Sequence, residues 1–155
     1  MQGLRLSIAA DLLLSVVLLW GRIRAGCYEQ EKKGGEVATY SGSCHCGAVN
    51  FEVNAELTKG VVCDCTICKR KGAVMVLIDK EQLTITSGTE QLSSYQFNTN
   101  IANHFFCRTC GIYTHHKRRR DDGFGVNTGC LDNFSVTDFD EVIKFKGSEL
   151  SVVED

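Results

Sequence analysis

Seven cysteines of this 155-residue chain lie in three short clusters whose spacing suits metal ligands. The clusters are Cys44-His45-Cys46, Cys63-Asp64-Cys65-Thr66-Ile67-Cys68 and Cys107-Arg108-Thr109-Cys110. Thiolates at such spacings are soft ligands for a tetrahedral ion, most often zinc. Four thiolates close a structural zinc site, whereas three leave the open position that a catalytic metal needs. Seven thiols therefore suggest one closed site and one open site.

The spacing also suggests how the thiols divide between the two sites. In an extended segment, residues i and i+2 face the same side, so each C-x-C presents two thiolates in one direction. A C-x-x-C needs a tight turn, and Gly111 after the last cysteine suits it. The simplest closed site joins two pairs that lie far apart in the chain, Cys44 and Cys46 with Cys107 and Cys110. The remaining set, Cys63, Cys65 and Cys68, is local and one ligand short.

Two alternatives remain open for the metal. A histidine can complete a second structural zinc site, and the candidates are His45, His104, His115 and His116. An iron–sulfur cluster needs only thiolates, although no familiar cluster spacing is present.

Composition limits the classes of protein to which the chain can belong. The formal net charge of -2 argues against a general nucleic-acid binder, so we expect no specific nucleic-acid partner. The hydrophobic fraction of 43% is ordinary for a globular protein, so a core can form. Nine cysteines, seven of them in C-x-C and C-x-x-C clusters, are typical of metal ligands in a reducing compartment, which predicts a cytoplasmic location.

The first 38 residues differ in character from the rest and are predicted to be an apolar helical extension with a linker. The apolar stretch from Leu12 to Trp20 is short for a membrane span, which needs about 20 apolar residues. It can be a signal, an anchor or a dispensable extension, and any membrane contact is expected only through residues 4–21. Basic residues gather after this stretch, so an anchor would keep the following domain in the cytoplasm.

Residues 39–155 are predicted to form one mainly β domain. Val49, Phe51 and Val53 alternate with polar residues, which is typical of a half-buried strand. Further short apolar or alternating runs are bounded by glycine and asparagine turns. Expected strands lie at 61–62, 73–78, 83–86, 95–97, 104–106, 112–114 and 124–126. Val136 to Val142 is the one stretch in this part that suggests a helix.

Four ordered motifs give the chain a resemblance to a known family. They are Ser43-Cys44-His45-Cys46-Gly47-Ala48-Val49, Cys63-Asp64-Cys65-Thr66-Ile67-Cys68-Lys69, Phe106-Cys107-Arg108-Thr109-Cys110-Gly111 and Gly125-Val126-Asn127-Thr128-Gly129-Cys130-Leu131-Asp132. Together they resemble the glutathione-dependent formaldehyde-activating enzyme family, which also includes centromere protein V. The resemblance spans about residues 40 to 147.

The resemblance implies a β-tent zinc-binding fold of short antiparallel strands with two zinc ions. It implies that Cys44, Cys46, Cys107 and Cys110 hold the structural zinc. It implies that Cys63, Cys65 and Cys68 hold the catalytic zinc. The implied activity is carbon–sulfur lyase chemistry on S-hydroxymethylglutathione, the adduct of glutathione and formaldehyde. The chain departs from the family where Thr66 and Lys69 replace the frequent Ser and Arg.

Basic residues after the last cysteine of the second cluster are candidate binding groups. Glutathione carries two carboxylates, and Lys69 and Arg70, followed by Lys71, can receive them. The alternative for this triplet is a solvated basic loop. The competing function for the whole chain is a non-catalytic zinc module that binds a protein or nucleic acid. The two functions differ in the metal coordination that they require. A lyase needs a metal ion with an open coordination position, whereas a non-catalytic module needs no open position.

Other chemically active residues are expected to be structural. The basic run Lys117 to Arg120 is followed at once by Asp121 and Asp122, which predicts a solvated hairpin loop. His115 and His116 before it can still carry protons in a pocket. Cys130 is expected to be a buried thiol. Cys27 has no partner that the sequence indicates.

Overall fold

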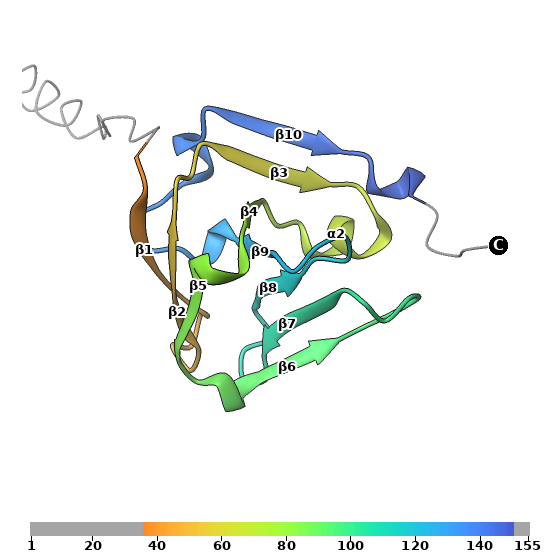
Figure 1. The fold of residues 1–155 in the computed structure, drawn as a ribbon. Coiled ribbons are helices and arrows are strands. Elements are labelled where there is room, and N and C mark those ends of the chain that lie inside the picture. Colours follow the sequence, from red (N-terminus) through yellow and green to blue (C-terminus); the bar gives the residue numbers. More distant parts are fainter. Residues whose placement is uncertain (1–35, 151–155) are drawn as a thin grey trace, which may run out of the picture. The chain divides into compact units, whose positions relative to one another are not determined.

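The computed structural model describes residues 36–150, and the strands in this part of the chain form two sheets (Figure 1). The three-stranded sheet has the order β1-β2-β5, and the seven-stranded sheet has the order β10-β3-β4-β9-β8-β7-β6. The strands are β1 Ala38–Ser43, β2 Asn50–Ala55, β3 Lys59–Cys63, β4 Met75–Ile78, β5 Leu83–Ser87, β6 Leu92–Tyr95, β7 Asn103–Cys107, β8 Tyr113–Lys117, β9 Phe124–Asn127 and β10 Glu141–Phe145. The prediction of a mainly β fold is confirmed.

Alternation along β2 explains the three-stranded sheet. Phe51, Val53 and Ala55 are buried, and the residues between them are exposed, as the sequence predicts. Gly42 lies opposite Phe51 in the antiparallel pair of β1 and β2. A Cβ atom at Gly42 would lie 2.7 Å from the Phe51 ring, so the missing side chain lets that ring lie against β1.

The seven-stranded sheet joins distant parts of the chain. In Figure 1, β10 and β3 run side by side at one end of it, and β7 and β6 form the other end. Neighbouring strands pair antiparallel except β10 and β3, which are parallel, with Glu141 opposite Lys59 and Phe145 opposite Cys63. This parallel pair is a departure from the expected all-antiparallel arrangement.

Two separate groups of buried residues support the sheets. The larger core contains Phe51, Val53, Ala55, Leu57, Val76, Ile78, Val126, Cys130, Leu131 and Phe139. The smaller one contains only Cys44, Val49 and Cys107, with Ala48, Leu92 and Cys110 packed against it. Three buried residues supply little hydrophobic free energy, so the smaller group needs another source of stability.

The helical segments among the described residues are short. The α-helix α2 spans Thr66–Lys71, and the 3-10 turns span Lys80–Gln82, Thr89–Gln91, Thr128–Cys130, Val136–Asp138 and Gly147–Glu149. Helix α2 ends at Gly72, whose left-handed backbone (φ 63°) lets its N–H donate to the carbonyl of Cys68. No pattern in the sequence indicates this helix, because six residues are too few for a periodic pattern.

The helix suggested for Val136 to Val142 is wrong. Only Val136–Asp138 is helical, as one 3-10 turn, and Val142 lies in β10. The Ser135 side chain accepts a hydrogen bond from Thr137, and the Ser135 N–H donates to the Asp138 carboxylate. These bonds close a single turn, and pairing with β3 then stabilises an extended conformation that local sequence cannot reveal.

The predicted extension at residues 1–38 lies almost wholly outside the described residues, as do residues 151–155. Among the described helices, none has the length and apolar character to cross a membrane.

We expect residues 39–155 to fold as a domain without the extension. The first described strand begins at Ala38, so a chain shortened to residues 36–155 keeps the whole of β1. It also keeps the pairing of β1 with β2, in which Ala38 lies opposite Ala55. The shortened chain should bind as much zinc as the full chain and unfold at the same temperature within a few degrees. Metal analysis and thermal circular dichroism measure both quantities. An insoluble product without zinc would contradict the expectation.

Burial of His115 should make folding sensitive to acid. Its ring stacks on Phe105 at 4.6 Å, and burial lowers its pKa to about 4. Below pH 6.5 the unfolded chain therefore binds a proton that the folded chain does not. Stability should fall by about 1.4 kcal/mol per pH unit between about pH 6.5 and pH 4 because of this residue.

The change His115→Phe keeps a ring beside Phe105 and removes the titrating group. Its free energy of unfolding, measured with denaturant at several pH values, should decline less steeply than that of the wild type in this interval. Thiolate protonation contributes equally to both proteins and cancels in the difference. Parallel slopes for the two proteins would rule out His115 as a source of acid sensitivity.

Candidate metal and substrate site

Four thiols from two distant segments converge at the predicted closed site. Cys44 and Cys46 follow β1, Cys107 ends β7, and Cys110 lies in the turn before β8. The sulfur atoms of Cys44 and Cys46 are 3.6 Å apart, and those of Cys46 and Cys107 are 3.7 Å apart. All four sulfurs lie within 4.8 Å of one another. The structure therefore brings together the set that the sequence assigns to one site.

Two turns aim these thiols at a common point. Gly47 and Gly111 both have positive φ (73° and 74°), and their N–H groups donate to the carbonyls of Cys44 and Cys107. Backbone N–H groups also approach the sulfurs, since Val49 N lies 3.3 Å from Cys44 Sγ. The N–H of Ile112 helps to lower the pKa of the Cys110 thiol to about 6. The contact at Cys110 favours its thiolate, the form that binds metal.

The donor set fits a tetrahedral zinc ion. Zinc–sulfur bonds of about 2.3 Å place tetrahedral sulfurs about 3.8 Å apart. The measured separations of 3.6 and 3.7 Å are close to that value. Four thiolates of this geometry can hold one metal ion with no position left for a substrate.

Three further thiols gather where β3 meets α2. Cys63 ends β3, Cys65 is the residue before the helix, and Cys68 lies in its first turn. Their sulfurs also lie within 4.8 Å of one another. None of the four histidines belongs to this group, and all four lie in the described part of the chain. The cluster can hold a metal ion and is one thiolate short of the other set.

Crowding of these thiols favours a bound cation. Burial raises the pKa of the Cys68 thiol, and the neighbouring thiols Cys65 and Cys63 raise it further. Three thiolates in one place repel one another, so protons or a metal ion must offset their charge.

The segment after β10 covers one side of the three-thiol cluster. A Cβ atom at Gly147 would collide with Cys63 Sγ and lie 3.0 Å from Cys65 Cβ. The segment is attached through Asp64, whose carboxylate accepts bonds from Ser148 N at 2.8 Å and Ser148 Oγ at 2.9 Å. Neither Gly147 nor Asp64 was predicted to lie at the site. Only the parallel pairing of β10 with β3 brings them together, and no local pattern encodes that pairing.

A polar network lies next to the cluster. Lys71, the last residue of α2, places its Nζ atom 2.9 Å from His104 Nδ1 and 3.4 Å from the centroid of the Tyr113 ring. The Tyr113 hydroxyl lies 2.6 Å from His116 Nδ1. His104 and His116 are opposite each other on β7 and β8, with ring centroids 5.4 Å apart. The network therefore connects α2 to the sheet.

Burial determines which of these groups donate. It lowers the pKa of His104 to about 4, with help from the Lys71 charge, and that of His116 to about 3. It raises the pKa of Tyr113, so the hydroxyl keeps its proton and donates to His116. Burial also lowers the pKa of Lys71 to about 8. At neutral pH the Lys71 ammonium thus donates to a neutral His104.

Lys69 and Arg70 behave differently from Lys71. Both are exposed, and Arg70 donates to the carbonyl of Thr66 at 2.7 Å within its own helix. They lie within two residues of Cys68, in a helix and not in the loop that was considered as an alternative. A carboxylate near the cluster could reach them.

Cys130 belongs to neither cluster. Cys130 is a buried thiol, as expected, and its Sγ atom lies 3.6 Å from the carbonyl of Tyr113. Burial raises its pKa to about 11, so it stays protonated. Cys27 lies outside the described residues.

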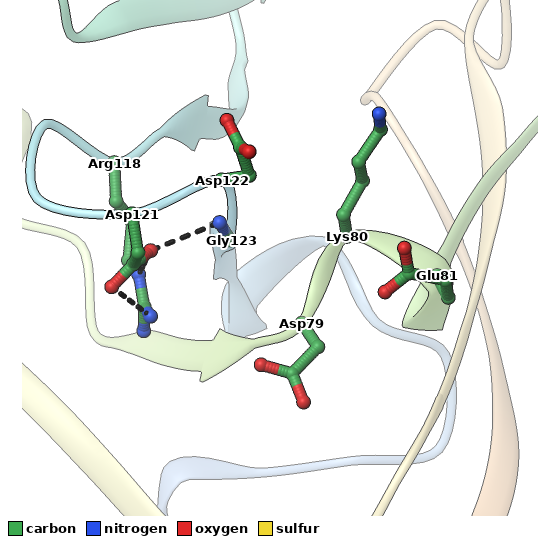
Figure 2. A pocket seen from close by; sticks show the side chains of 7 residues that line it. All are labelled: Asp79, Lys80, Glu81, Arg118, Asp121, Asp122 and Gly123. Atoms are coloured by element: carbon green, nitrogen blue, oxygen red, sulfur yellow. Dashed lines mark hydrogen bonds and ion pairs between the residues drawn. The ribbon is translucent and has the colours of Figure 1, made fainter.

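A depression of about 440 Å³ lies elsewhere, between the end of β4 and the loop joining β8 to β9 (Figure 2). Its lining is charged and includes no cysteine. Arg118 pairs with Asp121, whose carboxylate also accepts a bond from Gly123 N at 2.9 Å, and Lys117 pairs with Asp122 at 3.2 Å. The predicted hairpin loop is confirmed, and these pairs partly neutralise its basic charge.

Two comparisons relate the chain to known proteins. The family model described as glutathione-dependent formaldehyde-activating enzyme matches residues 39–145. A solved structure of a Rhodobacter sphaeroides protein is similar, with 42% sequence identity and a TM-score of 0.60. The match covers 66% of this chain and 99% of that chain. The matched residues include all seven clustered cysteines. The chain belongs to the family of glutathione-dependent formaldehyde-activating enzymes.

Proposed function

We propose that this protein is a zinc-dependent carbon–sulfur lyase acting on glutathione adducts of small aldehydes, such as S-hydroxymethylglutathione. The observation that carries the proposal is the three-thiol cluster, which has no fourth protein ligand among the described residues. A substrate thiolate is the natural fourth ligand for such a set. Family membership supports glutathione and formaldehyde as the chemical partners.

We assign a structural role to one cluster and a catalytic role to the other. Cys44, Cys46, Cys107 and Cys110 hold a structural zinc, whose binding free energy stabilises the fold. Cys63, Cys65 and Cys68 hold the catalytic zinc. When bound there, zinc lowers the pKa of a thiol and polarises oxygen as a Lewis acid. Free thiols at both clusters need reducing conditions, so we place the domain in the cytoplasm.

Lys69 and Arg70 supply positive charge for the carboxylates of glutathione. Both are exposed beside Cys68, so a ligand whose sulfur enters the cluster can extend along the helix surface toward them. An exposed ammonium or guanidinium bound to a carboxylate contributes modestly to affinity. These residues therefore tune binding of glutathione and take no part in bond breaking.

The division of labour predicts different outcomes for two cysteine variants. Cys110→Ala should abolish cooperative folding or cause gross aggregation, because its zinc joins segments far apart in the chain. Cys65→Ala should leave a folded protein with about one zinc ion fewer and little or no cleavage of S-hydroxymethylglutathione. Metal analysis, circular dichroism and a formaldehyde-release assay measure these outcomes.

Cys130→Ala is the matched control, since it removes a buried thiol that belongs to neither cluster. It should keep the zinc content and the activity of the wild type. If Cys65→Ala unfolds the protein as severely as Cys110→Ala, both zinc ions are structural and the lyase proposal fails.

Gly147 gives an independent test of the three-thiol cluster. Gly147→Ala forces a methyl group against Cys63 Sγ, and overpacking of this kind costs about 1–3 kcal/mol. The affinity of the three-thiol cluster for zinc should therefore fall roughly 5- to 150-fold, as measured in competition with a chelating dye. Gly129→Ala is the control, because its Cβ meets only Asn127 Oδ1, at 3.3 Å or more. Unchanged zinc affinity in Gly147→Ala would argue against metal binding between these three thiols.

A further inference from the structure

Lys71 is the one basic residue of α2 that turns toward the sheet. Its neighbours Lys69 and Arg70 are exposed, whereas Lys71 is half-buried and contacts His104 and Tyr113. Cys68 and Lys71 are three positions apart in the helix, which places their side chains on the same side. The ammonium group therefore lies beside the three-thiol cluster, held from the opposite side by β7 and β8.

The contacts of Lys71 leave part of its hydrogen-bonding capacity free. An ammonium group has three N–H donors. One is directed to His104 Nδ1 at 2.9 Å, and the face of the Tyr113 ring accepts the positive charge at 3.4 Å. Among residues 36–150, no carboxylate forms an ion pair with Lys71. Its charge and at least one donor are thus available to a ligand at the cluster.

The partners of Lys71 are themselves fixed in place. Tyr113 is oriented by its hydrogen bond to His116, and the His116 ring lies over Gly125, where any Cβ atom would collide with it. His104 stacks on Phe97 at 5.7 Å, and Phe97 stacks on Tyr95 at 5.8 Å. A donor supported by packed rings keeps its position, which is the requirement for stabilising charge in a transition state.

We propose that Lys71 is a catalytic residue that donates a hydrogen bond to the aldehyde oxygen of the substrate and stabilises the negative charge on it. This inference rests on the proposed function, since it concerns the oxygen of the glutathione adduct. Burial lowers the pKa of Lys71, and negative charge on Cys68 and Cys65 opposes that shift, which agrees with the position of Lys71 three residues after Cys68 in α2.

The step can be written with all atoms accounted for. In the direction of synthesis, the glutathione thiol gives its proton to water, a lone pair of the resulting thiolate forms the C–S bond, and the π pair of the C=O bond moves onto oxygen. That oxygen, bound to Lys71, then takes one proton back from the solvent, so no net proton is lost or gained. In the direction of cleavage, the hydroxyl gives its proton to water, the C=O bond re-forms, the C–S pair returns to sulfur, and the thiolate released takes a proton from the solvent. Lys71 remains an ammonium ion throughout.

The test compares two ligands that differ only in this oxygen. S-hydroxymethylglutathione is the proposed substrate, and S-methylglutathione, which lacks the hydroxyl group, is added as a competing ligand. In Lys71→Met, kcat/KM for the substrate should fall by about 10²–10³-fold, the usual effect of removing one such donor. The inhibition constant of S-methylglutathione and the zinc content should stay within about twofold of the wild type.

Two further variants make the result specific. Lys71→Gln keeps a donor for His104 without the charge, and it replaces Lys71→Met if that protein does not fold; the same loss of kcat/KM is expected. Lys69→Met changes the neighbouring exposed lysine, and it should weaken substrate and S-methylglutathione equally.

Each other result overturns the inference. Wild-type kcat/KM in the folded Lys71 variants means that the oxygen does not contact Lys71. Loss of zinc or of S-methylglutathione binding in those variants means that Lys71 instead balances the charge of the thiolates. If the zinc-loaded wild type neither binds glutathione nor cleaves the adduct, the proposed function fails, and the inference fails with it.

Discussion

The meeting of four thiols from two distant segments is the constraint on which the rest of the structure depends. Cys46 and Cys107 are 61 positions apart in the chain, yet their sulfur atoms lie 3.7 Å from each other. Among the described residues, the hydrophobic group around them has three buried members, and two of these, Cys44 and Cys107, are themselves thiols of the cluster. Apolar burial on that scale cannot offset the entropy of closing so long a loop. A metal ion bound by four thiolates can offset that entropy. The loop that it would close contains β2 to β7, including Cys63, Cys65 and Cys68.

The second cluster depends on that closure in a different way. Its three cysteines lie within six positions, so metal binding there closes almost no loop. Its surroundings come from elsewhere in the chain: β10 pairs with β3 and brings Gly147 against Cys63, and β7 and β8 bring His104 and Tyr113 toward Lys71. A metal ion in the first cluster would close a long loop of the chain, whereas one in the second would close almost none, so only the first can contribute much to folding by loop closure.

The sequence predicts the features of the structure that depend on local interactions, and it does not predict those that depend on distant ones. The C-x-C and C-x-x-C spacings specify the ligand sets because the geometry is local, and the alternation in β2 specifies its buried face for the same reason. Val136 to Val142 was misjudged because its apolar residues suit a helix or a strand, and only the distant partner β3 decides. Lys71 contacts His104 at a separation of 33 positions, and Asp64 contacts Ser148 at a separation of 84 positions. Gly147 likewise meets Cys63 from a distant part of the chain. One sequence holds no signal for such contacts. The three-residue spacing from Cys68 to Lys71 was the one local hint, visible only once α2 is known to be helical.

The nature of the partners of Lys71 explains why its charge stays usable. A lysine beside thiolates could be paired with a carboxylate, and its field at the cluster would then be largely cancelled. Here the contacts come instead from a neutral imidazole and the face of a tyrosine ring. Both hold the ammonium group in position without neutralising it. Burial keeps His104 neutral and Tyr113 protonated, so the same packing that orders the rings also preserves the positive charge next to the thiolates. Three neighbouring thiolates would oppose the growth of negative charge on a nearby substrate oxygen, and an unneutralised lysine held at a fixed place can stabilise that charge.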